Sequence, residues 1–178
     1  MDNYSPIEDF RFTHLHFKGN FGTNGQFILQ PSLEHRLATL TFSKSYLWAQ
    51  LEIEALDVKL VIFHSRMGGN MRIQQNGDTL TKMTNENGWL VWKQQPTSYQ
   101  GMKRSTGRFF WYPENTPKVA SLITSSHSKS ATGYLFNFMI KDEQPNRGEL
   151  LILLGVAFIQ LATPNFWIQG LSGFSQAP

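Results

Sequence analysis

Hydrophobic and polar residues alternate in short segments along most of this chain, with turn residues between the segments. Alternation with a period of two places every second side chain on one face, as in a β-strand with one buried face. Segment 46–56 is ambiguous. Tyr46, Trp48 and Gln50 alternate with apolar residues, as in a strand, but the Ala, Leu and Glu residues of the segment also suit a helix. We favour a strand. The other segments expected to be strands are 10–17, 26–30, 37–42, 58–64, 71–75, 79–83, 89–93, 108–112, 119–124 and 134–140.

Turn signals separate these segments at short intervals. Asn-Gly occurs at 24–25, 76–77 and 87–88, and an Asn-Gly pair between alternating segments is the strongest short-range signal for a β-hairpin. Glycine also marks turns at 68–70 and 105–107. We assign 96–104 to a polar loop and the Ser/Lys-rich segment 125–130 to a further turn. Short, evenly spaced strands of this kind indicate an antiparallel sandwich or barrel.

The segment 149–162 departs from the alternation. Between Leu150 and Ala162 it contains a single polar side chain, Gln160, and its apolar residues cover all faces of a helix. Such a helix must be buried in a protein core or in a membrane. Asn146 and Glu149 have the spacing of a capping box, and Thr163 precedes a proline, so we expect a helix over 147–163. A bilayer core requires about 20 apolar residues, which is longer than this segment.

Together these elements predict a mainly β fold, a closed antiparallel barrel of about 12 strands around a hydrophobic C-terminal helix. An eight-stranded barrel is just filled by its own side chains, so a barrel that holds a helix must be wider. The length of 178 residues fits one domain over 10–168, and we expect flexible tails at 1–9 and 169–178.

Composition and charge narrow the expected partners. The chain has 16 Lys and Arg against 13 Asp and Glu, a mild excess that does not indicate a nucleic-acid binder. It contains no cysteine, which fits a reducing compartment. The N-terminal residues are acidic and polar and resemble no secretory signal. We therefore expect a cytoplasmic monomer, with peripheral membrane association as a further option.

Motifs for catalysis are missing from the sequence. It has no GxSxG, GxGxxG or Walker A pattern. His14 and His16 share a strand face, but we expect them to face solvent and bind no metal. Gly68-Gly69-Asn70 fits a hairpin turn better than an anion cradle. Glu52, Glu54 and Asp57 are expected to be exposed strand residues. We expect no enzymatic activity, no cofactor and no metal.

The order of the C-terminal elements resembles the tubby C-terminal-like superfamily, which includes phospholipid scramblases and the plant LURP-one-related proteins. The residues that carry the resemblance are Gly107–Tyr112, Lys118–Ile123 and the apolar segment Glu149–Ala162. The resemblance implies a twelve-stranded barrel around a central hydrophobic helix. The stretch Lys141–Arg147 is short and mixes charges, unlike the acidic calcium-binding stretch of scramblases, so calcium-driven lipid scrambling is not expected.

Basic side chains are the candidate binding residues. The resemblance implies that the barrel wall binds anionic phospholipid headgroups such as phosphoinositides. The candidates are Arg66, Arg72, Lys103, Arg104, Arg108 and Lys118. We therefore expect a non-enzymatic barrel that binds such lipids or a protein partner. The alternatives are a tail-anchored or scramblase-like membrane protein that uses the 150–168 helix, and a carrier barrel for an apolar small ligand.

Overall fold

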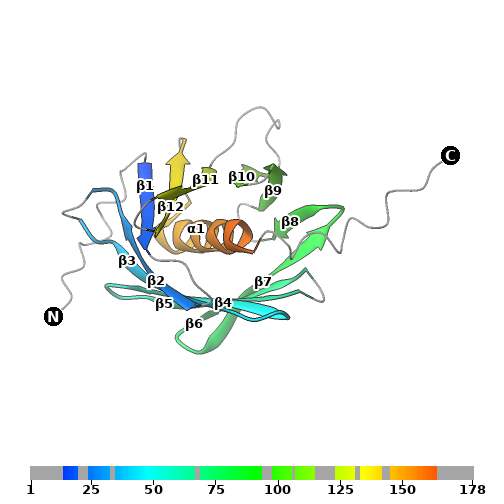
Figure 1. Cartoon of the computed structure of the whole chain (residues 1–178). Helices are drawn as coiled ribbons and strands as arrows, with labels where there is room; N and C mark the ends of the chain where they lie inside the picture. Colours follow the sequence, from blue (N-terminus) through cyan, green and yellow to red (C-terminus); the bar gives the residue numbers. More distant parts are fainter. Residues whose placement is uncertain are drawn as a thin grey trace.

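Twelve strands form a closed barrel around one helix in the part of the chain that the computed structural model describes (Figure 1). That part comprises residues 14–19, 24–32, 35–66, 69–93, 98–105, 107–114, 123–130, 133–141 and 145–163. The strands are β1 (His14–Gly19), β2 (Asn24–Gln30), β3 (Ala38–Lys44), β4 (Trp48–Ala55), β5 (Lys59–Ser65), β6 (Met71–Gln75), β7 (Asp78–Glu86), β8 (Trp89–Trp92), β9 (Tyr99–Ser105), β10 (Arg108–Pro113), β11 (Ile123–Ser130) and β12 (Gly133–Ile140). The helix is α1 (Arg147–Ala162).

The strands follow one another around the barrel in chain order, and every neighbouring pair is antiparallel. The barrel closes where β1 pairs with β12, from His14 opposite Met139 to Gly19 opposite Tyr134. Closure gives every strand a hydrogen-bonded neighbour on both sides, although β7 pairs with β8 only from Thr84 to Glu86. The predicted mainly β fold, with about twelve antiparallel strands in a closed barrel, is confirmed.

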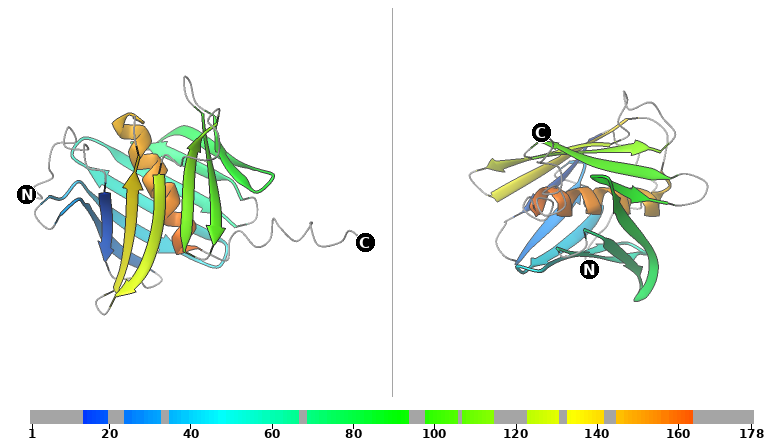
Figure 2. Two further views of the ribbon diagram at one scale, coloured as in Figure 1. Left: turned by 90° about the horizontal axis from the view of Figure 1, so that it is seen from above. Right: turned by 90° about the vertical axis from the view of Figure 1, so that its right-hand side faces the viewer.

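The helix α1 lies inside the barrel and crosses the strands at an angle (Figures 1 and 2). Every residue from Leu150 to Ala162 is buried. The predicted capping box is present, because Asn146 accepts a hydrogen bond from the backbone of Glu149 and the Glu149 side chain accepts one from Asn146. Thr163 is the C-cap, so the helix ends one residue before the predicted boundary.

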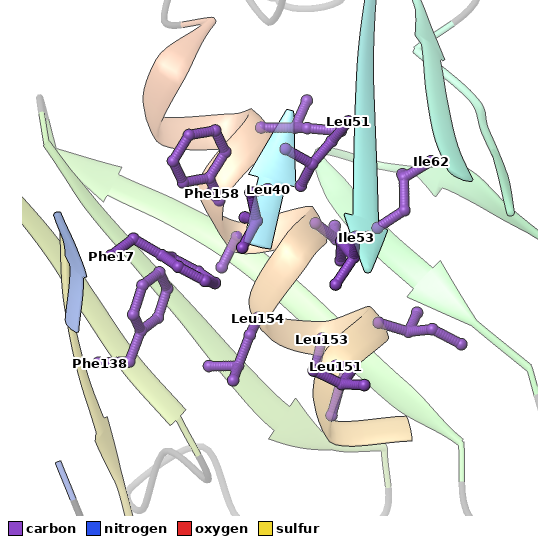
Figure 3. Packing of buried hydrophobic residues seen from close by; sticks show 14 of the residues in the cluster. Phe17, Leu40, Leu51, Ile53, Ile62, Phe138, Leu151, Leu153, Leu154 and Phe158 are labelled. Atoms are coloured by element: carbon purple, nitrogen blue, oxygen red, sulfur yellow. The ribbon is translucent and has the colours of Figure 1, made fainter. Parts of the chain in front are cut away.

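Aromatic rings of the barrel wall surround the C-terminal half of the helix. The ring of Phe158 packs edge-on against Phe17 at 5.4 Å, Phe27 at 4.9 Å and Phe42 at 5.5 Å between centroids. On another side, the indole of Trp111 donates a hydrogen bond of 2.8 Å to the carbonyl oxygen of Leu153. Figure 3 shows wall residues packed around the helix. The helix is therefore part of the hydrophobic core.

The two Asn-Gly turns have the geometry expected from the sequence. Asn76 and Gly77 have φ of 51° and 95°, and Asn87 and Gly88 have φ of 53° and 83°. Positive φ at both central residues defines the type I′ turn, whose twist matches that of the flanking strands. These turns connect β6 to β7 and β7 to β8.

The predicted loop at 96–104 was wrong for residues 99–104, which belong to β9. Tyr99 and Gly101 of this strand are buried. Gly101 lies directly opposite Trp111 on β10, and a Cβ atom at this position would lie 2.6 Å from the Phe109 ring. Large neighbouring rings fill the space in front of the glycine, so the inward position carries no apolar signal in the sequence.

The predicted turn at 125–130 was also wrong, because these residues belong to β11. Ser125 is fully buried, and its hydroxyl donates a hydrogen bond of 2.8 Å to the carbonyl oxygen of Phe109. A serine with a buried hydrogen bond takes an inward position that is usually apolar, so the alternation of apolar and polar residues in this strand is not visible in the sequence.

Segment 46–56 is a strand over 48–55, as favoured. The predicted strand residues 10–13 and 119–122 and the predicted tails 1–9 and 169–178 lie outside the described residues.

No helix in the described ranges is long and apolar enough to span a bilayer.

Candidate functional site

An antiparallel barrel places alternate connections at opposite ends. The connections β3–β4, β5–β6, β7–β8 and β9–β10 lie at one end, which we call the tyrosine rim. The connections β4–β5, β6–β7 and β8–β9 lie at the opposite end, together with the start of α1, where Tyr99 of β9 contacts Glu149.

The β3–β4 turn carries two exposed apolar side chains at the tyrosine rim. Tyr46 is 73% exposed and Leu47 is 52% exposed. The guanidinium of Arg66 lies 4.2 Å from the centre of the Tyr46 ring. The backbone N–H of Arg66 donates a hydrogen bond of 2.9 Å to the carbonyl oxygen of Leu47. The turn is therefore attached to the end of β5, and its apolar side chains face solvent beside a cation.

Aromatic and basic residues continue down the outer wall from this turn. The rings of Trp48 and Phe63 are stacked, with centroids 6.1 Å apart and planes at 20°. The guanidinium of Arg72 lies 5.6 Å from the Phe63 ring, and in the sheet Arg72 is directly opposite both Phe63 and Lys82. We call Tyr46, Leu47, Trp48, Phe63, Arg66, Arg72 and Lys82 the rim patch.

Two exposed cations of the rim patch, Arg72 and Lys82, lack an ion-pair partner among the residues that the structure describes. Like charges directly opposite each other on neighbouring strands repel. Toward the opposite end of the wall, by contrast, Lys59 lies 3.8 Å from Glu52, and Glu54 and Asp57 are exposed, as expected for these carboxylates. The wall formed by β4 to β7 is thus basic around Arg72 and Lys82 and acidic at the other end. The carboxylate of Glu86, where β7 ends at the tyrosine rim, pairs with Lys93 at 3.1 Å.

The structure brings together two of the six predicted binding residues, Arg66 and Arg72. Arg108 is exposed at the start of β10, and β7, β8 and β9 separate that strand from β6. Lys103 and Arg104 lie in β9 near the β9–β10 turn, but their side chains are outside the described residues, as is the whole of Lys118. The predicted grouping of these four residues stays a prediction.

Five residues of the rim patch were not among the binding residues predicted from the sequence: Tyr46, Leu47, Trp48, Phe63 and Lys82. The alternation of segment 46–56 assigned Tyr46 to a strand, whereas Tyr46 and Leu47 form the turn before β4. Ser45 is the residue that could have indicated this turn in the sequence, because serine side chains often bond to the backbone in turns. Here its hydroxyl accepts a hydrogen bond of 3.2 Å from the Leu47 backbone N–H.

Of the two histidines expected to face solvent, His14 does so and His16 is half-buried. His14 is exposed, and the Nδ1 of partly buried His16 lies 2.7 Å from the Asn137 side-chain oxygen. The described part of the chain has no group of three or more His, Cys, Asp or Glu that could hold a metal. Trp92 and Trp111 belong to the core, and Trp89 is partly buried in the wall.

His64, on the inner face of β5, is the buried histidine of the described residues. Burial lowers its pKa to about 4, so its imidazole is neutral at physiological pH.

No protein-family model, curated protein sequence or solved structure matches this chain.

Proposed function

We propose that this barrel is a non-enzymatic binding module whose rim patch docks on anionic phospholipid surfaces. The observation that carries the proposal is the exposed Tyr46–Leu47 turn beside the uncompensated charges of Arg72 and Lys82. Tyrosine and other aromatic residues are enriched at the membrane–water interface, where their ring and hydroxyl occupy different environments. Basic residues near an anionic surface each contribute about 1 kcal/mol.

The polarity of the β4–β7 wall supports one orientation. With the tyrosine rim toward the lipid, Arg66, Arg72 and Lys82 approach the phosphates while Glu54 and Asp57 point away from them. The anionic surface potential is greatest at the cytoplasmic leaflet. We therefore propose a cytoplasmic protein that associates peripherally with membranes.

The other hypotheses place different demands on α1. A tail anchor, or a carrier cavity that fills the barrel interior, requires the side chains from Leu150 to Ala162 to leave the core in which they are buried. Removing this much apolar surface from the core would eliminate the main stabilising force of the fold. The experiment below also distinguishes lipid binding from binding of a protein partner at the rim patch.

The test is flotation of the purified protein with neutral phosphatidylcholine vesicles and with vesicles that also contain phosphatidylserine. The protein should float only with the anionic vesicles, and added salt should weaken binding because exposed charges are screened within about 8 Å at physiological ionic strength. Replacing Arg72 and Lys82 together with glutamine should reduce the affinity at least about tenfold, at about 1 kcal/mol per charge.

The matched control replaces Lys59 and Lys93 with glutamine. Both are exposed, but they already pair with Glu52 at 3.8 Å and Glu86 at 3.1 Å, so binding should change little. The variant Tyr46→Ser/Leu47→Ser should weaken the salt-resistant part of binding. A further variant, Arg104→Gln/Arg108→Gln, tests whether the β9–β10 cations contribute. Equal loss in the control and rim variants, or no flotation of the parent at low salt, would refute the lipid proposal and favour a protein partner.

A further inference from the structure

A second feature lies at the end of the barrel opposite the tyrosine rim, where α1 begins. A cleft of about 190 Å³ opens there between the helix and strands β5 to β8. Its walls are mostly apolar, with Leu60, Leu80, Trp92 and Ile152 among them, and Gln75 and Glu149 add polar groups. A cavity of about 150 Å³ is enough to hold a benzene molecule, so this cleft matches a ligand with one aromatic ring and a short chain.

A β-bulge forms one wall of the cleft. On β6, Ile73 pairs with Thr81 while the next residue, Gln74, pairs with Thr79, so Leu80 is an extra residue on β7. Leu80 lines the cleft and is 50% exposed. Bulges redirect a side chain and are common beside functional sites. Here the bulge places an apolar side chain at the edge of the cleft, where a bound molecule would cover it.

Glu149 supplies a carboxylate to the cleft. The side chain is 8% exposed. Its Oε2 accepts hydrogen bonds from the Tyr99 hydroxyl at 3.2 Å and from the Asn146 backbone N–H at 3.0 Å. Burial and the nearby Glu149 charge raise the pKa of Tyr99 to about 12, so this hydroxyl remains a donor at neutral pH. Within the described residues, Oε1 accepts no hydrogen bond, which leaves one carboxylate oxygen for a ligand.

The charges around the cleft favour a cation. The helix N-terminus carries about half a positive charge, and among the residues that line the cleft the only ionisable side chain is the carboxylate of Glu149. Asp78, opposite Gln75 in the sheet, is exposed near the same edge. Lys59 is also close in sequence to the cleft, but it lies 3.8 Å from Glu52.

We propose that this cleft binds a small aromatic ammonium compound, with its ring between Leu80, Trp92 and Ile152 and its ammonium group donating to Glu149 Oε1. Charge-assisted hydrogen bonds are about twice as strong as neutral ones, so the ammonium group is the selective element. The site is independent of the rim patch, and failure of either proposal leaves the other unaffected.

The test is an NMR titration of the isotope-labelled full-length protein with 2-phenylethylammonium, 2-phenylethanol and 3-phenylpropionate. The ammonium compound should give saturable shifts at millimolar concentration for the Trp92 indole N–H and the Gly148 amide. The alcohol should bind at least about tenfold more weakly because it lacks the charge-assisted bond, and the carboxylate should not bind.

Two arginine variants at exposed leucines provide the matched control. Leu80→Arg places a positive charge in the cleft and should abolish binding, whereas Leu56→Arg changes a leucine that is 56% exposed and does not line the cleft. Both variants should keep the circular dichroism spectrum of the parent. The proposal is overturned if the ammonium compound gives no saturable shift, if the carboxylate binds as tightly as the ammonium compound, or if both arginine variants bind equally well.

Discussion

Replacing Gln160 with methionine should stabilise the folded barrel. Gln160 is completely buried on α1, and within the described residues neither atom of its amide has a hydrogen-bond partner. In the unfolded chain water forms hydrogen bonds with both atoms, so folding removes these hydrogen bonds without replacing them. A buried polar group without a partner costs about 1–3 kcal/mol. Methionine is also unbranched and has a similar helix propensity, so the exchange removes this penalty and largely preserves packing.

The expected gain of about 1–3 kcal/mol corresponds to a rise of about 2–12 °C in Tm, since 1 kcal/mol shifts a domain of this size by about 2–4 °C. Urea denaturation followed by tryptophan fluorescence would measure the free energy of unfolding. Ile159→Met is the matched control, because its side chain is completely buried but apolar, and the exchange should lower stability by less than about 1.5 kcal/mol. If Gln160→Met destabilises the protein as much as the control does, the amide has a partner in the native state and the argument fails.

Substitutions at three further positions test the core and the helix cap. The pKa of His64 is about 4 in the folded protein, against an ordinary value of 6.5. As the pH falls from 6.5 to 4, the unfolded chain is therefore protonated at His64 before the folded protein is, and the free energy of unfolding falls by about 3 kcal/mol. His64→Leu should flatten this part of the pH–stability curve measured by urea denaturation, and an unchanged slope would exclude His64 as its source. Gly101→Ala should lower stability by about 1–3 kcal/mol, because its Cβ would lie 2.6 Å from the Phe109 ring; an unchanged urea midpoint would show that the ring moves freely. Asn146→Ala should cost about 1 kcal/mol and Asn146→Ser much less, since serine also caps helices; equal losses in Tm would contradict a capping role.

The positions of most elements could be predicted because local chemistry determines them. Asn76-Gly77 and Asn87-Gly88 accept positive φ at low cost, so each forms a type I′ turn between two strands, whereas Asn24-Gly25 lies within β2. Asn146 and Glu149 cap α1 through groups only three residues apart. A helix that is apolar on all faces must be enclosed, which required a barrel wider than eight strands.

Strand β9 and much of β11 could not be predicted in the same way. Gly101 and Ser125 occupy inward positions that are not strongly apolar. Gly101 is suited to its position because the Phe109 and Trp111 rings of the next strand fill the space. Ser125 is suited to its position because a carbonyl oxygen of the neighbouring strand accepts a hydrogen bond from its hydroxyl. These reasons lie on other strands, beyond the range of any local pattern.

The sequence by itself determined the strand periodicity, the turns and the enclosed helix, because these follow from side chains within a few residues of one another. Only the tertiary structure decided which side chains form the rim patch. Tyr46, Arg66 and Arg72 lie in different strand connections or strands, and the register of β3 to β7 brings them together. Alternation determines which face a side chain occupies, but not which residue lies opposite it. That pairing depends on the closure of the whole barrel around α1.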